Sequence, residues 1–164
     1  MVLEQIGILQ NEPISACAFT GHRELPRDFS YSLLKKQVEQ LIKEGVSSFY
    51  VGMARGFDLS AAKAVLSLKK KYPQVKMIAC IPFYNQEKYY TPSERRRYAS
   101  YIKKADEQVV LCEHYRKGCL HERNRYMADR ADVLVALLRE NTGGTAYTVG
   151  YFKKKYPFKR VIFL

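Results

Sequence analysis

The sequence predicts an α/β fold, a Rossmann-like three-layer αβα arrangement around a mostly parallel central sheet. Short apolar segments alternate with longer amphipathic segments along the chain. Several of the short segments are apolar on both faces, which is typical of parallel strands covered by helices on both sides. The 164 residues suffice for one core, and we expect residues 1–164 to form a single domain.

The first half of the chain begins this alternation. An apolar strand is predicted at residues 14–20, and apolar residues at helical spacing predict a helix over residues 28–44. Gly45 then supplies the left-handed conformation that commonly ends a helix. The second strand is predicted at residues 46–53, and a second helix follows over residues 58–72, with a proline directly after it.

The second half continues the same pattern after a strand at residues 75–81. Residues 82–91 form a polar and aromatic connection, and Pro92 occupies a first helical turn, where its missing N–H costs nothing. Helices are then predicted at residues 92–105, 120–130 and 143–155. They alternate with strands predicted at residues 107–112, 132–138 and 159–164.

The composition excludes several classes of protein. No segment reaches the roughly 18 apolar residues of a membrane helix. Residues 1–13 lack the basic start and apolar stretch of a signal peptide, so we expect no export. The four cysteines form no C-x-x-C pair, which argues against a metal site. We expect reduced thiols in a cytoplasmic protein with no membrane contact.

The net charge of +12 favours an anionic partner, such as a nucleotide, a nucleic acid or an acidic surface. Much of this charge has a simpler explanation. Residues 69–71 and 153–155 are lysines at expected helix ends, where cations complement the helix dipole and stay solvated. The arginines at residues 95–97 lie near a helix start and are not explained in this way.

Four loops carry candidate binding residues, because ligands of such sheets bind beyond the carboxyl ends of the strands, where strand order reverses. The first loop holds Thr20, Gly21, His22 and Arg23 directly after the first strand. Its glycine permits close approach of a ligand, and Thr20 and Arg23 are donors for phosphate. An ordinary turn explains the same residues equally simply.

The second loop brackets an arginine between two glycines. It consists of Gly52, Met53, Ala54, Arg55, Gly56, Phe57 and Asp58. The loop joins a strand to a helix N-terminus, where backbone N–H groups and the helix dipole attract anions. Asp58 has two interpretations, contact with a ribose hydroxyl or a cap for the helix.

The remaining two loops precede later helices. One carries Glu122, Arg123, Asn124 and Arg125. Its two arginines point to different helix faces, so one can reach a site while the other is solvated. The other loop carries Thr142, Gly143, Gly144 and Thr145. It is the strongest single signal, since it offers bare N–H groups and a hydroxyl to a phosphate.

Together the four loops resemble the SLOG superfamily, which includes DprA/Smf and the LOG proteins, and they are most similar to its YpsA-like branch of small stand-alone bacterial domains. Residues 52–58 resemble the Ser-Gly-x-Ala-Arg-Gly-Ile-Asp motif of DprA. Residues 123–125, followed by the strand at residues 131–135, resemble its Arg-Asn-Arg segment. The similarity covers nearly the whole chain.

The LOG proteins carry a similar His-Glu-Arg-Lys stretch, matched here by residues 121–124. The resemblance implies that Arg123 corresponds to the arginine with which LOG proteins hydrolyse the N-glycosidic bond of nucleoside monophosphates. In their Pro-Gly-Gly-x-Gly-Thr-x-x-Glu motif, Gly144 and Thr145 match, but Thr148 replaces the glutamate. Threonine cannot stabilise an oxocarbenium-like state or activate water as a carboxylate does. Asp58 and Glu122 are carboxylates that could take the place of this glutamate.

Three functions follow from these patterns. The first is a sensor or regulator that binds a nucleoside phosphate, NAD or ADP-ribose through its phosphate and ribose. The alternatives are an N-glycosidic hydrolase of LOG type, with Arg123 and Glu122 as catalytic candidates, and DprA-like binding of single-stranded nucleic acid. Tyr84, Tyr89 and Tyr90 either stack on a base or pack in the fold. Many SLOG proteins self-associate, so self-association into a homo-oligomer is a further alternative for the partner.

Overall fold

Six short segments form one parallel sheet in the computed structural model, which describes residues 13–164. They are β1 (Ala16–Gly21), β2 (Ser48–Val51), β3 (Lys76–Phe83), β4 (Glu107–Cys112), β5 (Val133–Leu137) and β6 (Arg160–Phe163). The strand order is β4-β3-β2-β1-β5-β6, and every neighbouring pair is parallel. The predicted fold class is confirmed, and within the described residues the sheet is wholly rather than mostly parallel.

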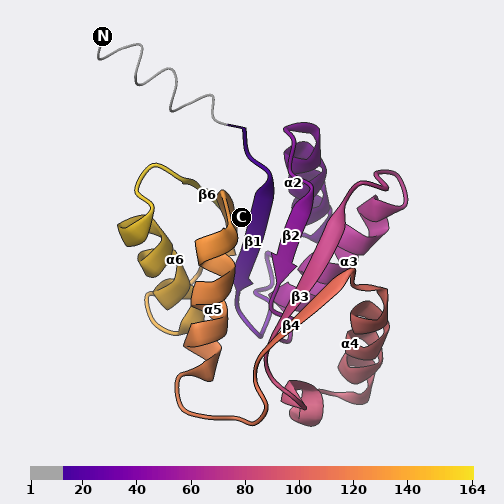
Figure 1. The fold of residues 1–164 in the computed structure, drawn as a ribbon, viewed down its shortest axis with the longest axis vertical. Helices are drawn as coiled ribbons and strands as arrows, with labels where there is room; N and C mark the ends of the chain where they lie inside the picture. Colours follow the sequence, from indigo (N-terminus) through magenta and orange to yellow (C-terminus); the bar gives the residue numbers. More distant parts are fainter. Residues whose placement is uncertain (1–12) are drawn as a thin grey trace.

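Helices cover both faces of this sheet (Figure 1). The helices are α2 (Tyr31–Lys43), α3 (Phe57–Lys69), α4 (Pro92–Lys104), α5 (Cys119–Arg130) and α6 (Gly144–Lys155), with a short 3₁₀ helix η1 (Gln86–Tyr89) before α4. α2, α3 and α4 pack on one face and α5 and α6 on the other, which gives the three layers.

The central strand β1 contributes to both halves of the core. Cys17 and Phe19 belong to the apolar cluster beneath α2 and α3, whereas Ala18 belongs to the cluster beneath α5 and α6. Phe19 stacks on Phe49 of β2 at a centroid distance of 6.0 Å. Burial on both faces explains why β1 shows no polar alternation in the sequence.

The strand order reverses between β1 and β5, which are neighbours in the sheet. From β1 the chain proceeds through β2 and β3 to β4 on one side, and it then crosses to β5 and β6 on the other. The loops after β1 and β5 therefore separate from each other above the sheet. This is the position at which parallel α/β sheets bind ligands.

Side chains and glycine set the helix ends. Ser30 caps α2 by accepting a hydrogen bond from Leu33 N at 3.2 Å, so this helix begins three residues later than residue 28. Gly45 follows α2 with a φ of 116°, as predicted. Thr91 and Glu94 form a capping box around the first turn of α4, which starts at the predicted proline.

The predictions about export, membrane helices and cysteines can be compared with the structure only in part. The segment before residue 13, which bears on the signal-peptide prediction, lies outside the described residues. Within residues 13–164, none of the helices combines the length and apolar character needed to span a bilayer. Cys17, Cys80 and Cys119 are buried, Cys112 is half-buried, and all are free thiols.

Candidate ligand-binding site at the β1–β5 switch point

A cavity of about 630 Å³ lies above the carboxyl ends of β1 and β5. The loop after β1, the loop before α6 and the first turns of α5 enclose it. Its lining consists of Phe19, Thr20, Gly21, His22, Arg23, Glu24, Leu25, Pro26, Ala54, Asp58, Leu120, His121, Arg123, Asn124, Arg139, Glu140, Thr142, Gly143, Gly144 and Thr145. The structure thus brings residues from all four predicted loops to one place.

The loop after β1 is fixed by contacts on both sides. A Cβ on Gly21 would lie 2.3 Å from the ring of Phe57, so only glycine fits against α3. His22 accepts a hydrogen bond at Nε2 from Arg139 N at 2.8 Å, which joins this loop to the loop after β5. Phe57 N donates to the His22 carbonyl at 3.1 Å. This part of the cavity wall is consequently held by contacts within the protein.

The loop at residues 52–58 supports the cavity floor. Gly56 has a φ of 71°, and a Cβ there would lie 2.2 Å from the Arg23 carbonyl oxygen, so two loops meet backbone to backbone. Asp58 accepts a hydrogen bond from Ala54 N at 3.1 Å. The N-cap of α3 is Gly56, without a side-chain cap, so the capping role considered for Asp58 is not observed.

Arg123 is the buried cation of the site, with 5% of its surface exposed. Its Nη1 donates to the carbonyls of Gly52 and Cys80, and its Nε donates to Asn124 Oδ1 at 2.8 Å. A Cβ on Gly52 would lie 2.7 Å from Nη1, so the close approach of the guanidinium requires glycine. These bonds use Nε and Nη1 of the guanidinium.

Asp58 places a buried carboxylate near this guanidinium. Burial raises the pKa of Asp58 to about 6, and the opposing effects of Arg123, the Ala54 N–H and Arg23 are smaller. A Cβ on Gly52 would also lie 2.8 Å from Asp58 Oδ2, so the Arg123 guanidinium and the Asp58 carboxylate both lie next to this glycine. The site therefore holds a carboxylate that changes protonation close to neutral pH.

The N-terminus of α6 supplies donors for an anion. Gly143, with a φ of 94°, is its N-cap, and no side chain caps it. The first N–H that bonds back within the helix is that of Tyr147, to the Gly143 carbonyl at 3.0 Å. The amides of residues 144–146 precede this bond. Thr145 is 5% exposed and lines the cavity.

Several predicted residues lie outside the lining. Arg55 forms a two-point ion pair with Glu94 of α4, at 2.8 and 3.1 Å, instead of facing the cavity. Glu122 pairs with Arg116 at 2.6 Å. Gly52, Met53 and Gly56 shape the loop without lining the cavity, and Met53 adopts a left-handed φ of 62°.

Three further side chains have other roles. Thr148 donates from Oγ1 to the Gly144 carbonyl at 2.8 Å, within α6 and behind the cavity wall. Tyr90 donates to the Met53 carbonyl at 3.0 Å. Tyr84 and Tyr89 are exposed, at 59% and 85%, and do not line the cavity.

The structure adds residues that were not among the predicted binding set. They are Phe19, Glu24, Leu25, Pro26, Leu120, His121, Arg139 and Glu140. Arg139 and Glu140 lie in the loop after β5, one residue beyond the strand, and this position is itself a usable signal in a parallel sheet. His121 was matched to a motif, but its place in the wall depends on how α5 packs against α6.

Comparisons with known proteins agree with this architecture. The YpsA family model, described as the YspA SLOG family, matches residues 28–161. A prophage-derived protein of Bacillus subtilis, YoqJ, is 31% identical over 132 residues, covering 73% of this chain and 77% of that protein. The UPF0398 protein YpsA of the same organism is 26% identical, with coverages of 74% and 69%.

Two solved structures share the fold. DNA processing protein A (DprA) from Streptococcus pneumoniae superposes with a TM-score of 0.66 at 20% identity, covering 96% of this chain and 52% of that one. DprA from Helicobacter pylori, described for its single-stranded DNA binding mode, has a TM-score of 0.64, also at 20% identity, with coverages of 94% and 67%. The chain spans about half the length of the first DprA, and this likeness establishes the fold alone.

Proposed function

Since the chain belongs to the YpsA SLOG family, we propose that its cavity binds a nucleotide or a nucleotide derivative through phosphate and ribose, as a sensor or regulator. The observation that carries the proposal is the meeting of Arg123, Asp58 and the α6 N-terminus in one cavity. A cavity of about 630 Å³ is in the size range of small-molecule sites.

The phosphate is assigned to the α6 end of the cavity. The amides at the start of α6 point along the helix dipole toward the ligand, and this arrangement favours an anion. Thr145 adds a hydroxyl, and Arg123 adds a buried guanidinium nitrogen. Because Arg123 is already held by carbonyl oxygens of Gly52 and Cys80, it need not be ordered when a ligand binds.

The charge balance of the lining favours a ligand that carries hydroxyl groups as well as phosphate. The lining holds as many arginines as carboxylates, namely Arg23, Arg123, Arg139, Glu24, Asp58 and Glu140. An inorganic polyanion gains little from these carboxylates, whereas ribose hydroxyls donate to them. A nucleoside monophosphate, NAD or ADP-ribose meets both requirements.

The test uses two threonines of α6 as a matched pair. Thr145 lines the cavity and Thr148 does not, although both are buried in the same helix. In thermal-shift and calorimetric titrations with AMP, NAD and ADP-ribose, Thr145→Val should weaken binding about ten-fold, since a lost hydrogen bond to a charged group costs about 1.5 kcal/mol. Thr148→Val should bind like the wild type. Absence of binding to all three ligands would overturn the proposal.

A second candidate, cleavage of the N-glycosidic bond, is favoured by one observation, the cavity carboxylate with a pKa of about 6. Asp58 stands in the lining, whereas Thr148, at the LOG glutamate position, does not. A carboxyl group with this pKa can exchange protons near neutral pH. Release of free base or nicotinamide, lost in Asp58→Asn and retained in Glu122→Gln, would support an enzyme.

The third candidate is single-stranded nucleic acid, which the H. pylori DprA is described as binding. The net charge of +12 is compatible with it. Phosphate contacts release counterions, so affinity for a DNA oligonucleotide would fall steeply between low and physiological salt. Gel-shift titration across salt separates this from nucleotide binding, since a mononucleotide would compete only if DNA occupies the same cavity.

A further inference from the structure

Two aromatic rings stack at the wall of the cavity. His121 of α5 and Tyr147 of α6 lie with centroids 3.9 Å apart and planes 8° from parallel. His121 is exposed and lines the cavity, whereas Tyr147 is half-buried and lies outside the lining. One face of the histidine ring is therefore covered by tyrosine, and the ring belongs to the cavity wall.

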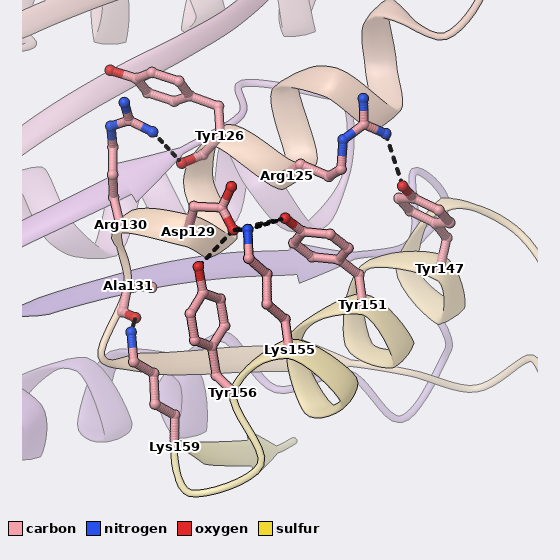
Figure 2. Close-up of polar contacts among 10 residues, drawn as sticks. All are labelled: Arg125, Tyr126, Asp129, Arg130, Ala131, Tyr147, Tyr151, Lys155, Tyr156 and Lys159. Carbon is pink, nitrogen blue, oxygen red and sulfur yellow. Dashed lines mark hydrogen bonds and ion pairs between the residues drawn. The ribbon is translucent and has the colours of Figure 1, made fainter.

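The tyrosine beneath this histidine is held in place. Arg125 donates from Nη1 to the Tyr147 hydroxyl at 2.8 Å, a contact from α5 to α6 that Figure 2 shows. On α6, Tyr151 lies nearly parallel to Tyr147, at a centroid distance of 6.4 Å and an angle of 17°. Tyr151 is in turn hydrogen-bonded to Asp129 of α5 at 2.7 Å (Figure 2). His121 thus rests on a fixed aromatic support.

The position of the stack relative to the proposed phosphate site is set by the helices. Tyr147 lies one turn after Gly144, and His121 lies one turn before Asn124, whose amide nitrogen would be 3.8 Å from a Cβ on Gly144. The first turns of α5 and α6 therefore face each other across the same end of the cavity. Leu120 and the Leu25–Pro26 segment add apolar surface to its lining.

We propose that His121, supported by Tyr147, is a stacking platform for the aromatic base of the ligand. The inference rests on the proposed function, because it assigns the base of a ligand whose phosphate lies at the α6 N-terminus. Bases stack on aromatic side chains, and a ring already immobilised by a neighbour loses little freedom on binding. The platform therefore selects nucleotides over sugar phosphates, and purines over pyrimidines, since purines offer the larger stacking surface.

The experiment compares a ligand with a base and one without. AMP and ribose 5-phosphate are titrated calorimetrically into the wild type, His121→Ala, His121→Phe and, as a matched control, His114→Ala, a histidine that is exposed and outside the lining. In His121→Ala the affinity for AMP should fall about ten-fold and that for ribose 5-phosphate should stay within two-fold. His121→Phe should restore AMP binding, and His114→Ala should change neither.

Other outcomes separate the two levels of the proposal. If AMP binds wild type and His121→Ala equally while only thermal stability falls, the stack merely fastens α5 to α6 and the platform is overturned alone. If both ligands weaken equally in His121→Ala, the histidine contacts phosphate or ribose, and the platform is again overturned. If the wild type binds neither of these ligands but binds NAD or ADP-ribose, the platform for a mononucleotide base is overturned alone. If it binds none of the four, the proposed function fails, and the platform fails with it.

Discussion

Two regions of the molecule present cations in a hollow, and they differ in how those cations are held. In the cavity at the switch point, Arg123 and Arg139 donate to carbonyl oxygens, and the lining holds as many carboxylates as arginines. A groove of about 550 Å³ between α3 and α4, in the opposite helical layer, is lined by Lys63, Leu66, Ser67, Lys69, Lys70, Tyr101 and Lys104. Lys63, Lys70 and Lys104 are exposed, with the Lys63 ammonium 4.5 Å from the centroid of the Tyr31 ring, and Lys69 pairs with Asp106.

This difference between the cavity and the groove indicates that positive charge alone does not make a ligand-recognition site. The groove between α3 and α4 carries more uncompensated positive charge, yet it offers no oriented backbone donors and no glycine-dependent close approach. The cavity carries little net charge but holds fixed donors and acceptors at set positions. We therefore expect substitutions in the cavity to change ligand affinity and fold stability together, and substitutions in the groove to change neither strongly.

The largest effect is expected for Arg123→Met. The substitution removes the guanidinium that donates to the carbonyls of Gly52 and Cys80, and Gly52 keeps only the Gln86 side-chain amide as a side-chain donor. It should lower the free energy of unfolding by about 4 kcal/mol and abolish nucleotide binding. Urea denaturation and ligand titration measure the two effects. Arg123→Lys, which keeps the charge but not the planar fork, should also bind weakly. Wild-type affinity in either variant would contradict the cavity assignment.

The next largest effect is expected in the pH dependence of the free energy of unfolding, through Asp58. A carboxyl group whose pKa is raised to about 6 in the folded protein binds more protons there than when unfolded, so its contribution to stability falls as pH rises from 4 to 6. The loss should amount to about 3 kcal/mol by pH 7. Asp58→Asn should flatten this part of the stability profile in denaturation series. A profile unchanged by the substitution would show that Asp58 is not the group responsible.

A smaller effect on stability is expected when alanine replaces glycine, and its sign should depend on the space around the new Cβ. Gly21→Ala would place a Cβ at 2.3 Å from the Phe57 ring and should cost about 2 kcal/mol through forced repacking. Gly150, in the middle of α6, has open space around its Cβ position. Gly150→Ala should therefore stabilise the protein by about 0.8 kcal/mol through helix propensity. Thermal denaturation of the pair measures both signs, and equal effects would contradict the interlocked cavity loop.

The smallest effect is expected in the groove between α3 and α4. The double variant Lys63→Ala, Lys104→Ala removes two of its cations, and nucleotide affinity should remain within two-fold because neither residue lines the cavity. The same variant should lower the salt dependence of any DNA binding if the groove contacts phosphates. A marked loss of nucleotide affinity would reverse the comparison between the two regions.

The sequence was informative where local chemistry decides the outcome. Each predicted strand and helix exists in the described residues, with shifts at the ends such as that of α2, which begins at Tyr31 after its cap Ser30 rather than at residue 28. The loops after β1 and β5 were predicted to meet because parallel strands end at one edge, and the cavity lies there. These features depend on neighbours in sequence or on the general geometry of parallel sheets.

Contacts between segments far apart in the chain could not be predicted from the sequence in this way. Arg55 appeared to be a phosphate ligand, but its partner is Glu94, supplied by a different helix. The tyrosines at residues 84, 89 and 90 were considered for stacking, but they do not line the cavity, whereas His121 does. Its support, Tyr147, comes from α6, so only the packing of two helices reveals the pair.

The backbone contact between Gly56 and Arg23 has a consequence for how ligand preference can diversify among relatives. Two loops that touch through backbone atoms cannot be lengthened or reshaped one at a time without separating the cavity floor from its wall. Exchange of side chains on the first turns of α5 and α6 leaves that contact intact. New specificities in this family should therefore arise from point substitutions near residue 121 rather than from loop insertions at the floor.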